Sequence, residues 1–172
     1  MDLSTRKYIS ELAQRIINTY NIEVPISNIE DIVHTLGGKI EIKADFDDLY
    51  DGTICKSGEN GFVIALPSYK NEQRKTFAIA HELGHLFLHM GFMTDKELWK
   101  KQPQETYISF RTSEQEYQAN EFANSLLMPK ELYKQVLKDN IKENSVNVLL
   151  IAKSFNVPIS AAVSRGQSLG YL

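Results

Sequence analysis

The spacing of hydrophobic positions along this chain is of two kinds, three to four residues in some segments and two residues in others. Apolar side chains recur every three or four positions in the first segment, which predicts an amphipathic helix over residues 4–20 with Ser4 or Thr5 as its cap. A capping-box pattern over residues 27–30 predicts a second, shorter helix that stops at Gly37 and Gly38. The chain therefore begins with two helices.

A two-residue alternation of apolar and polar positions follows these helices. It predicts strands over residues 39–43, 51–56 and 62–66, the last two joined by a polar, glycine-containing turn. These segments are expected to form a small antiparallel or mixed sheet of at least three strands. Residues 61–66, which directly precede the next helix, are expected to be an exposed edge of that sheet.

Residues 71–90 are apolar almost all round a helix, so we expect a long helix that is central and buried. Residues 91–111 are expected to be irregular, with a short strand or a lid near residues 107–110. Further helices are predicted over residues 113–128, 129–140, 145–155 and 159–168. The order of elements predicts an α+β fold. We expect one domain over residues 1–130 and a helical subdomain, similar in rhythm to a helix-turn-helix, over residues 131–172.

The central helix carries the sequence His81-Glu82-Leu83-Gly84-His85. On a helix His81 and His85 lie on one face, one turn apart, where two neutral imidazoles can bind one Zn²⁺. Glu82 lies about 60° round the helix from His85, so it can activate a water molecule without binding the metal. A structural role for these polar groups would bury them without partners on an apolar helix, at a high free-energy cost. The motif predicts a zinc hydrolase site.

Catalytic zinc takes three protein ligands, so one more is needed. Glu116 is the preferred candidate, because Asn120 lies one turn further on and can hold the ring of His81 by a hydrogen bond. Glu121 lies about 140° round the helix from Glu116, so both cannot face one site. Glu121 and Glu114 stay as alternatives on the residues alone.

His89 is a further candidate that lies on the same helix. It is two turns from His81, about 12 Å along the helix axis, and cannot share a metal ion with both other histidines on a straight helix. We expect it to be an imidazole with a hydrogen-bond partner at the end of the helix.

Two motifs together resemble the ImmA/IrrE family of metallopeptidases. The first runs from Arg74 through the His-Glu-x-x-His motif to His89, and the second runs from Glu116 through Ala119 and Asn120 to Pro129. The resemblance implies a zincin-like fold with a gluzincin-like site. Its metal ligands would be His81, His85 and Glu116, with one Zn²⁺ and Glu82 as the catalytic base. It also implies that the substrate is a transcriptional repressor with a helix-turn-helix fold, as in phage, mobile-element or stress-response regulation.

Composition restricts the location and the partners. The net charge is −3 and the last predicted helix carries one cation, Arg165, so we expect no direct DNA binding. The single cysteine, Cys55, cannot form an internal disulfide, which favours a reducing compartment. The polar N-terminus does not resemble a signal peptide, and the longest apolar stretch is interrupted by the motif. We therefore expect a cytoplasmic protein without a membrane span.

Two functions are consistent with these patterns. The first is a site-specific zinc endopeptidase that cleaves or inactivates a repressor. The second is a regulator that keeps the zinc fold as a scaffold and sequesters a repressor or antitoxin-like partner without proteolysis. The sequence offers four candidates for the group that stabilises the oxyanion, each with an alternative structural role: His34, Tyr107, Arg111 and Tyr117.

Overall fold

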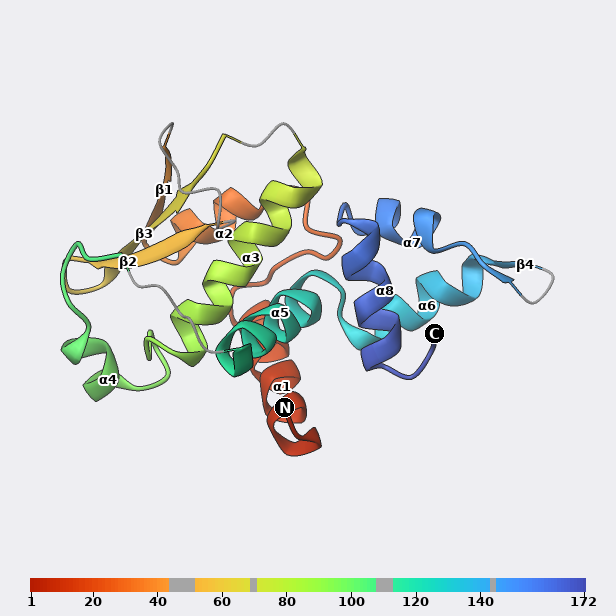
Figure 1. Ribbon diagram of the computed structural model, residues 1–172, viewed down its shortest axis with the longest axis horizontal. Coiled ribbons are helices and arrows are strands. Elements are labelled where there is room, and N and C mark those ends of the chain that lie inside the picture. The colour runs from red at the N-terminus through yellow and green to blue at the C-terminus, as the bar shows by residue number, and fades with distance from the viewer. Residues whose placement is uncertain (44–51, 69–70, 108–112, 143–144) are drawn as a thin grey trace. The chain divides into compact units, whose positions relative to one another are not determined.

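A computed structural model describes residues 1–43, 52–68, 71–107, 113–142 and 145–172 (Figure 1). It is a mixed α+β fold, as predicted. The chain forms two compact units, one of residues 28–120 and the other of residues 1–27 with 121–172. Helix α5 (Ser113–Leu127) contributes its first half to one unit and its second half to the other. The division into domains at residues 130 and 131 stays a prediction.

The unit of residues 28–120 contains a three-stranded mixed sheet. Its strands are β1 (Gly38–Ile42), β2 (Thr53–Ser57) and β3 (Gly61–Leu66), close to the predicted segments. The order is β1-β3-β2, with β3 parallel to β1 and antiparallel to β2. The expectation that residues 61–66 form the edge is therefore wrong. β3 is the middle strand, and its nearly continuous burial from Phe62 to Leu66 is typical of a strand covered on both faces.

Helices α2 (Ile29–Thr35) and α3 (Glu72–Leu88) accompany this sheet. The α3 helix begins at Asn71, whose side chain accepts hydrogen bonds from the backbone N–H groups of Gln73 and Arg74. It packs against β2, β3 and α2, and most of its residues after the first turn are buried, as expected (Figure 1). A capped, buried helix of this kind gives its side chains fixed directions.

A short helix, α4 (Lys96–Lys101), lies in the segment that we expected to be irregular. Asp95 caps it by accepting hydrogen bonds from the N–H groups of Glu97 and Leu98. Only Trp99 is buried, and its indole N–H donates to the carbonyl of Glu59. One buried residue establishes no helical period, which is why the pattern of hydrophobic positions missed this helix.

Among its described residues, the other unit is mainly helical, with two short paired strands. It contains α1 (Leu3–Thr19), the second half of α5, α6 (Lys130–Asp139), α7 (Val148–Ser154) and α8 (Ile159–Ser168). Strands β4 (Ile141–Lys142) and β5 (Ser145–Val146), which were not expected, pair between α6 and α7. The cap of α1 is Asp2, whose carboxylate accepts from the N–H of Thr5 at 2.8 Å, so the expected cap at Ser4 or Thr5 is wrong.

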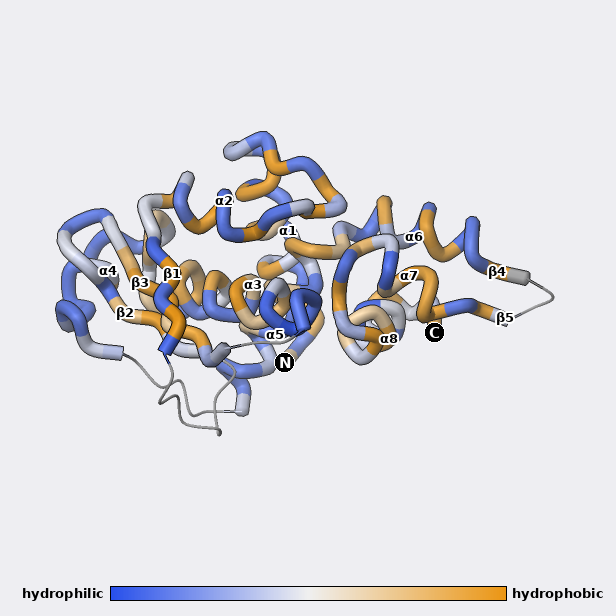
Figure 2. The backbone as a smooth tube through the Cα atoms, turned by 90° about the horizontal axis from the view of Figure 1, so that it is seen from above, coloured by the Kyte–Doolittle hydropathy of each residue, from blue (hydrophilic) through white to orange (hydrophobic). Residues whose placement is uncertain are grey.

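Hydrophobic and hydrophilic residues are interspersed along the helices of both units (Figure 2). Within the described residues, none of the helices combines the length and the apolar character needed to cross a membrane.

Candidate metal centre

His81 and His85 project from the buried part of α3 and converge. Their Nε2 atoms lie 3.0 Å apart, and their ring centroids lie 4.7 Å apart. His85 is buried and His81 is partly buried. Their i, i+4 spacing on one helix, which the sequence showed, is what brings the two nitrogens to one point.

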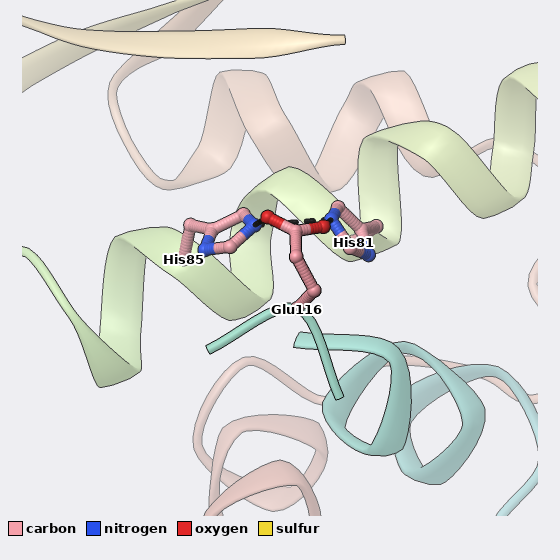
Figure 3. A group of neighbouring side chains, drawn as sticks. All are labelled: His81, His85 and Glu116. Atoms are coloured by element: carbon pink, nitrogen blue, oxygen red, sulfur yellow. Dashed lines mark hydrogen bonds and ion pairs between the residues drawn. The ribbon is translucent and has the colours of Figure 1, made fainter. Parts of the chain in front are cut away.

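Glu116, from the first half of α5, meets both histidines. Its Oε2 lies 3.2 Å from Nε2 of His81, and its Oε1 lies 3.3 Å from Nε2 of His85. Figure 3 shows the carboxylate between the two rings. Among the described residues, His81, His85 and Glu116 are the group of ligand atoms close enough to share one metal ion.

The spacing of the two Nε2 atoms and the Glu116 carboxylate oxygens fits zinc. Nitrogen and oxygen ligands at about 2.0–2.2 Å from a tetrahedral Zn²⁺ lie about 3.4 Å from one another. The distances of 3.0 to 3.3 Å between the two Nε2 atoms and the Glu116 oxygens are close to that value. Two imidazoles with a carboxylate, and a fourth position left for water or substrate, also make up a donor set of catalytic zinc sites.

Asn120 holds the outer nitrogen of His81. Its Oδ1 lies 3.0 Å from Nδ1 of His81. A ring that offers the lone pair of Nε2 to a metal carries its proton on Nδ1, which then donates to this oxygen. The structure thus brings Asn120 to the place that the sequence analysis predicted.

The alternative ligands have other partners. Glu121 binds Arg165, with 3.0 Å between its Oε1 and Nη1 of the arginine, and it accepts hydrogen bonds from Ser168. Glu114 accepts a hydrogen bond from Nε2 of Gln118 at 3.2 Å. Of the three glutamates considered, Glu116 alone joins the two histidines.

The contacts of His89 were missed in part by the sequence analysis. Its Nδ1 lies 2.9 Å from Nδ1 of His85, and its Nε2 lies 3.0 Å from Oε1 of Gln118. His89 is therefore a neighbour of a candidate ligand. The signal in the sequence was the repeat of the i, i+4 spacing from His85 to His89, which puts both rings on one face of α3.

Glu82 lies within the core of the same unit, with 5% of its surface exposed. The backbone just before β2 approaches it closely, because a Cβ atom on Gly52 would lie 3.0 Å from Oε1 of Glu82. A side chain at position 52 would therefore press on this carboxylate, and the approach brings the N-terminal end of the edge strand β2 beside it.

The electrostatics of the two histidines differ. Burial, together with the neighbouring His81 and His89, lowers the pKa of His85 to about 2, so its neutral form, which can bind a metal, dominates. Burial also opposes the charge on His81, but Glu116 and Glu82 outweigh it and raise the pKa of His81. The site is thus a partly buried group of electron-pair donors that includes a negatively charged carboxylate, which suits a cation.

The four oxyanion candidates have varied surroundings. Tyr107 donates its hydroxyl to Glu41 at 3.2 Å, and Nδ1 of His34 lies 3.3 Å from the carbonyl of Gly38. Tyr117 is 63% exposed, and Arg111 lies outside the described residues. These contacts identify no oxyanion group.

Residues 28–165 match the model of the Peptidase_M78 family, described as the IrrE N-terminal-like domain. The match covers the three-stranded sheet, the two histidines, Glu116, helix α7 and most of helix α8. It confirms the resemblance inferred from the two motifs. A comparison with curated proteins gives no match.

Proposed function

Because the chain belongs to the Peptidase_M78 family of IrrE N-terminal-like domains, we propose that it is a zinc-dependent, site-specific endopeptidase. The observation that carries the proposal is the convergence of His81, His85 and Glu116. The two Nε2 atoms lie 3.0 Å apart, and each lies 3.2 or 3.3 Å from one of the two carboxylate oxygens of Glu116. Glu82, buried on the same helix next to His81, adds a carboxylate that could act as the general base.

The donor set favours zinc. His81 and His85 would bind through Nε2 and Glu116 through its carboxylate, and this mixture of nitrogen and oxygen ligands suits Zn²⁺ better than Mg²⁺ or Ca²⁺. When bound, Zn²⁺ supplies a Lewis acid that polarises a carbonyl group and lowers the pKa of water towards neutrality.

Glu82 is the proposed general base and acid. Its carboxylate would take a proton from the attacking water and then deliver that proton to the nitrogen of the leaving amine. A positioned carboxylate in this role contributes about 10²–10⁴-fold to the rate. Gly52 leaves the room that the carboxylate needs, because any side chain there would meet it.

The proposed substrate is a helix-turn-helix transcriptional repressor, which rests on the resemblance of the two motifs to the ImmA/IrrE family. The finer fold assignment belongs to the same proposal: a zincin-like core with a helix-turn-helix-like segment at α7 and α8, acting in the cytoplasm. We propose one Zn²⁺ per chain and no direct contact with DNA.

The substrate would bind along the outer edge of β2. Peptides commonly add a strand to an exposed sheet edge, and β2 is the edge strand whose first end lies beside Glu82. The other end of that edge is covered, since the N–H of Glu105 donates to the carbonyl of Lys56 at 2.8 Å. Of the two ends of β2, the first is therefore the one that lies beside the proposed catalytic carboxylate.

The test is cleavage of a helix-turn-helix repressor, for which the product of the gene next to this one is the first protein to examine. The purified protein with zinc is incubated with the repressor, and fragments are identified by mass spectrometry. We expect Glu82→Gln to abolish fragments, while Glu72→Gln, the same change on the exposed first turn of α3, leaves cleavage intact.

Full-length repressor that stays bound to the protein without fragments would support the alternative, a regulator that sequesters its partner. Cleavage that persists in the Glu82→Gln variant would refute the catalytic role of this glutamate.

A further inference from the structure

We propose that His89 is a positioning residue of the metal centre, which accepts the Nδ1 proton of His85 and thereby holds Nε2 of His85 towards Glu116 and His81. This inference rests on the proposed zinc site and extends it by one residue. All the residues involved belong to the unit of residues 28–120.

The hydrogen bonds from His85 to His89 and from His89 to Gln118 form a series in which every proton is donated in the same direction. Nε2 of His85 faces Oε1 of Glu116 at 3.3 Å, so as a ligand it offers its lone pair there and carries its proton on Nδ1. That N–H donates to Nδ1 of His89 at 2.9 Å. His89 then carries its own proton on Nε2, which donates to Oε1 of Gln118 at 3.0 Å.

This series of hydrogen bonds ends at the carboxylate of Glu114. Nε2 of Gln118 donates to Oε1 of Glu114 at 3.2 Å. This last contact fixes which end of the Gln118 amide faces His89, so the oxygen is the end available to accept. His89 thus connects Nδ1 of His85, the ring nitrogen that faces away from Glu116, to Gln118 on α5.

His81 and His85 are therefore supported in different ways by the same helix. His81 reaches α5 in one step, because its Nδ1 lies 3.0 Å from Oδ1 of Asn120. Nδ1 of His85 is connected to α5 through His89 and Gln118. The α5 helix thus supplies the third ligand, Glu116, and the outer partners of both histidine ligands. Such partners orient the imidazole and raise its basicity, and their loss lowers metal affinity about 10–100-fold.

The competing role for His89 is that of a metal ligand. Its Nδ1 faces His85 and its Nε2 faces Gln118, so both ring nitrogens are in hydrogen-bond contacts. The three atoms that converge at ion-sharing distance come from His81, His85 and Glu116. The positions of the ring nitrogens favour a positioning role, and a substitution that keeps the acceptor separates the two roles.

The experiment is a zinc-affinity measurement on the full-length protein by competition with a chromophoric chelator at one fixed pH. His89→Leu removes the acceptor. His89→Asn keeps one, because its amide oxygen is bonded to Cγ as Nδ1 of histidine is. Gln118→Leu removes the next link. The matched control is His34→Leu, the remaining histidine of the chain, which lies exposed on α2.

We expect His89→Leu to bind zinc about 10–100-fold more weakly than the wild type. His89→Asn should recover most of that loss, Gln118→Leu should lose less than His89→Leu, and His34→Leu should bind as the wild type does. With Co²⁺ in place of zinc, the ligand-field absorption bands of all these variants should keep the wild-type positions, because the ligands themselves are unchanged.

Wild-type zinc affinity in His89→Leu overturns the inference. Equal weakening in His89→Asn and His89→Leu, with shifted cobalt bands, also overturns it, because that result identifies His89 as a ligand. If His89→Leu does not fold, unchanged affinity in Gln118→Leu overturns it instead. A wild-type protein that does not bind zinc refutes the proposed function together with this inference, whereas the other outcomes leave the proposed function standing.

Discussion

Glu116 and Glu121 lie on one helix, α5, and their carboxylates have opposite surroundings. Glu116 faces two imidazoles, one of which burial holds in the neutral form. Glu121 belongs to what we term the Arg165 cluster, formed by Arg6, Glu121, Arg165 and Ser168. There its Oε1 pairs with Nη1 of Arg165 at 3.0 Å, and Ser168 donates to both of its oxygens.

The difference is the source of the positive charge. In the Arg165 cluster the chain supplies its own cation, so the buried carboxylate is compensated without any ligand. Arg165 also donates its Nε–H to the carbonyl of Met128, which ties α8 to the end of α5. At Glu116 the adjacent groups are electron-pair donors, and a cation from outside would complete them. Of two glutamates on one helix, the Glu116 side suits a metal and the Glu121 side serves structure.

The largest expected effect is on stability, in the Arg165 cluster. Arg165→Met leaves Glu121 buried without its main cation, which costs about 3–5 kcal/mol in the free energy of unfolding. The double variant Arg165→Met/Glu121→Leu should recover much of this, because both charges are then removed. Urea unfolding measures both, with Arg15→Met on the exposed face of α1 as the control. A loss below about 1 kcal/mol, the level of a surface ion pair, would contradict a structural role for this cluster.

The next largest effect is expected on zinc affinity, where variants of Glu116 and Glu121 can be compared directly. Glu116→Gln removes a ligand, so it should weaken zinc binding by more than the roughly 100-fold upper limit for an outer partner. Glu121→Gln, the same change on the same helix, should leave zinc affinity unchanged and lower stability instead. Competition with a chelator and thermal unfolding give the two readouts. Equal loss of zinc affinity in both variants would remove the distinction between the two carboxylates.

A smaller effect is expected at Asn120. Asn120→Ala removes the acceptor for Nδ1 of His81 and should weaken zinc binding about 10–100-fold. Asn120→Asp keeps an acceptor oxygen and should bind more tightly than the alanine variant. If both variants bind zinc as the wild type does, Asn120 does not orient the ring of His81.

The smallest effect concerns Glu82 rather than the ligands. Gly52→Ala puts a Cβ atom 3.0 Å from Oε1 of Glu82, so the carboxylate must move by a few tenths of an ångström. Since a misplacement of about 1 Å costs about 10²-fold in rate, we expect kcat to fall by up to about tenfold. KM and zinc affinity should stay unchanged. The substrate in this assay is the intact repressor that the wild type cleaves. A fall in zinc affinity would show that the change disturbs the ligands instead.

Local patterns in the sequence predicted the parts of the site that depend on a single helix. The spacing of His81 and His85 and the spacing of Glu116 and Asn120 are each one helical turn. The same rule indicated that Glu121 could not face the site together with Glu116, and the contacts of the two residues agree with this. Helical geometry is local, so it can be inferred from neighbouring residues alone.

Features that depend on distant segments could not be predicted in the same way. The position of β3 in the middle of the sheet depends on pairing with β1 and β2 at once, and an apolar run does not indicate which strands flank it. The partners of Glu121 come from α1 and α8, both far from it along the sequence. The hydrogen bond between His89 and Gln118 likewise required α3 and α5 to be packed together.

The central claim is that His81, His85 and Glu116 bind one zinc ion together. The most direct measurement is an anomalous difference map from crystals grown with zinc, with data collected on both sides of the zinc absorption edge. We predict one strong peak bonded to Nε2 of His81, Nε2 of His85 and the carboxylate of Glu116, at about 2.0–2.2 Å from each. A map with no peak among these three residues, or with a peak bound to His89 or Glu121 in their place, would contradict the claim.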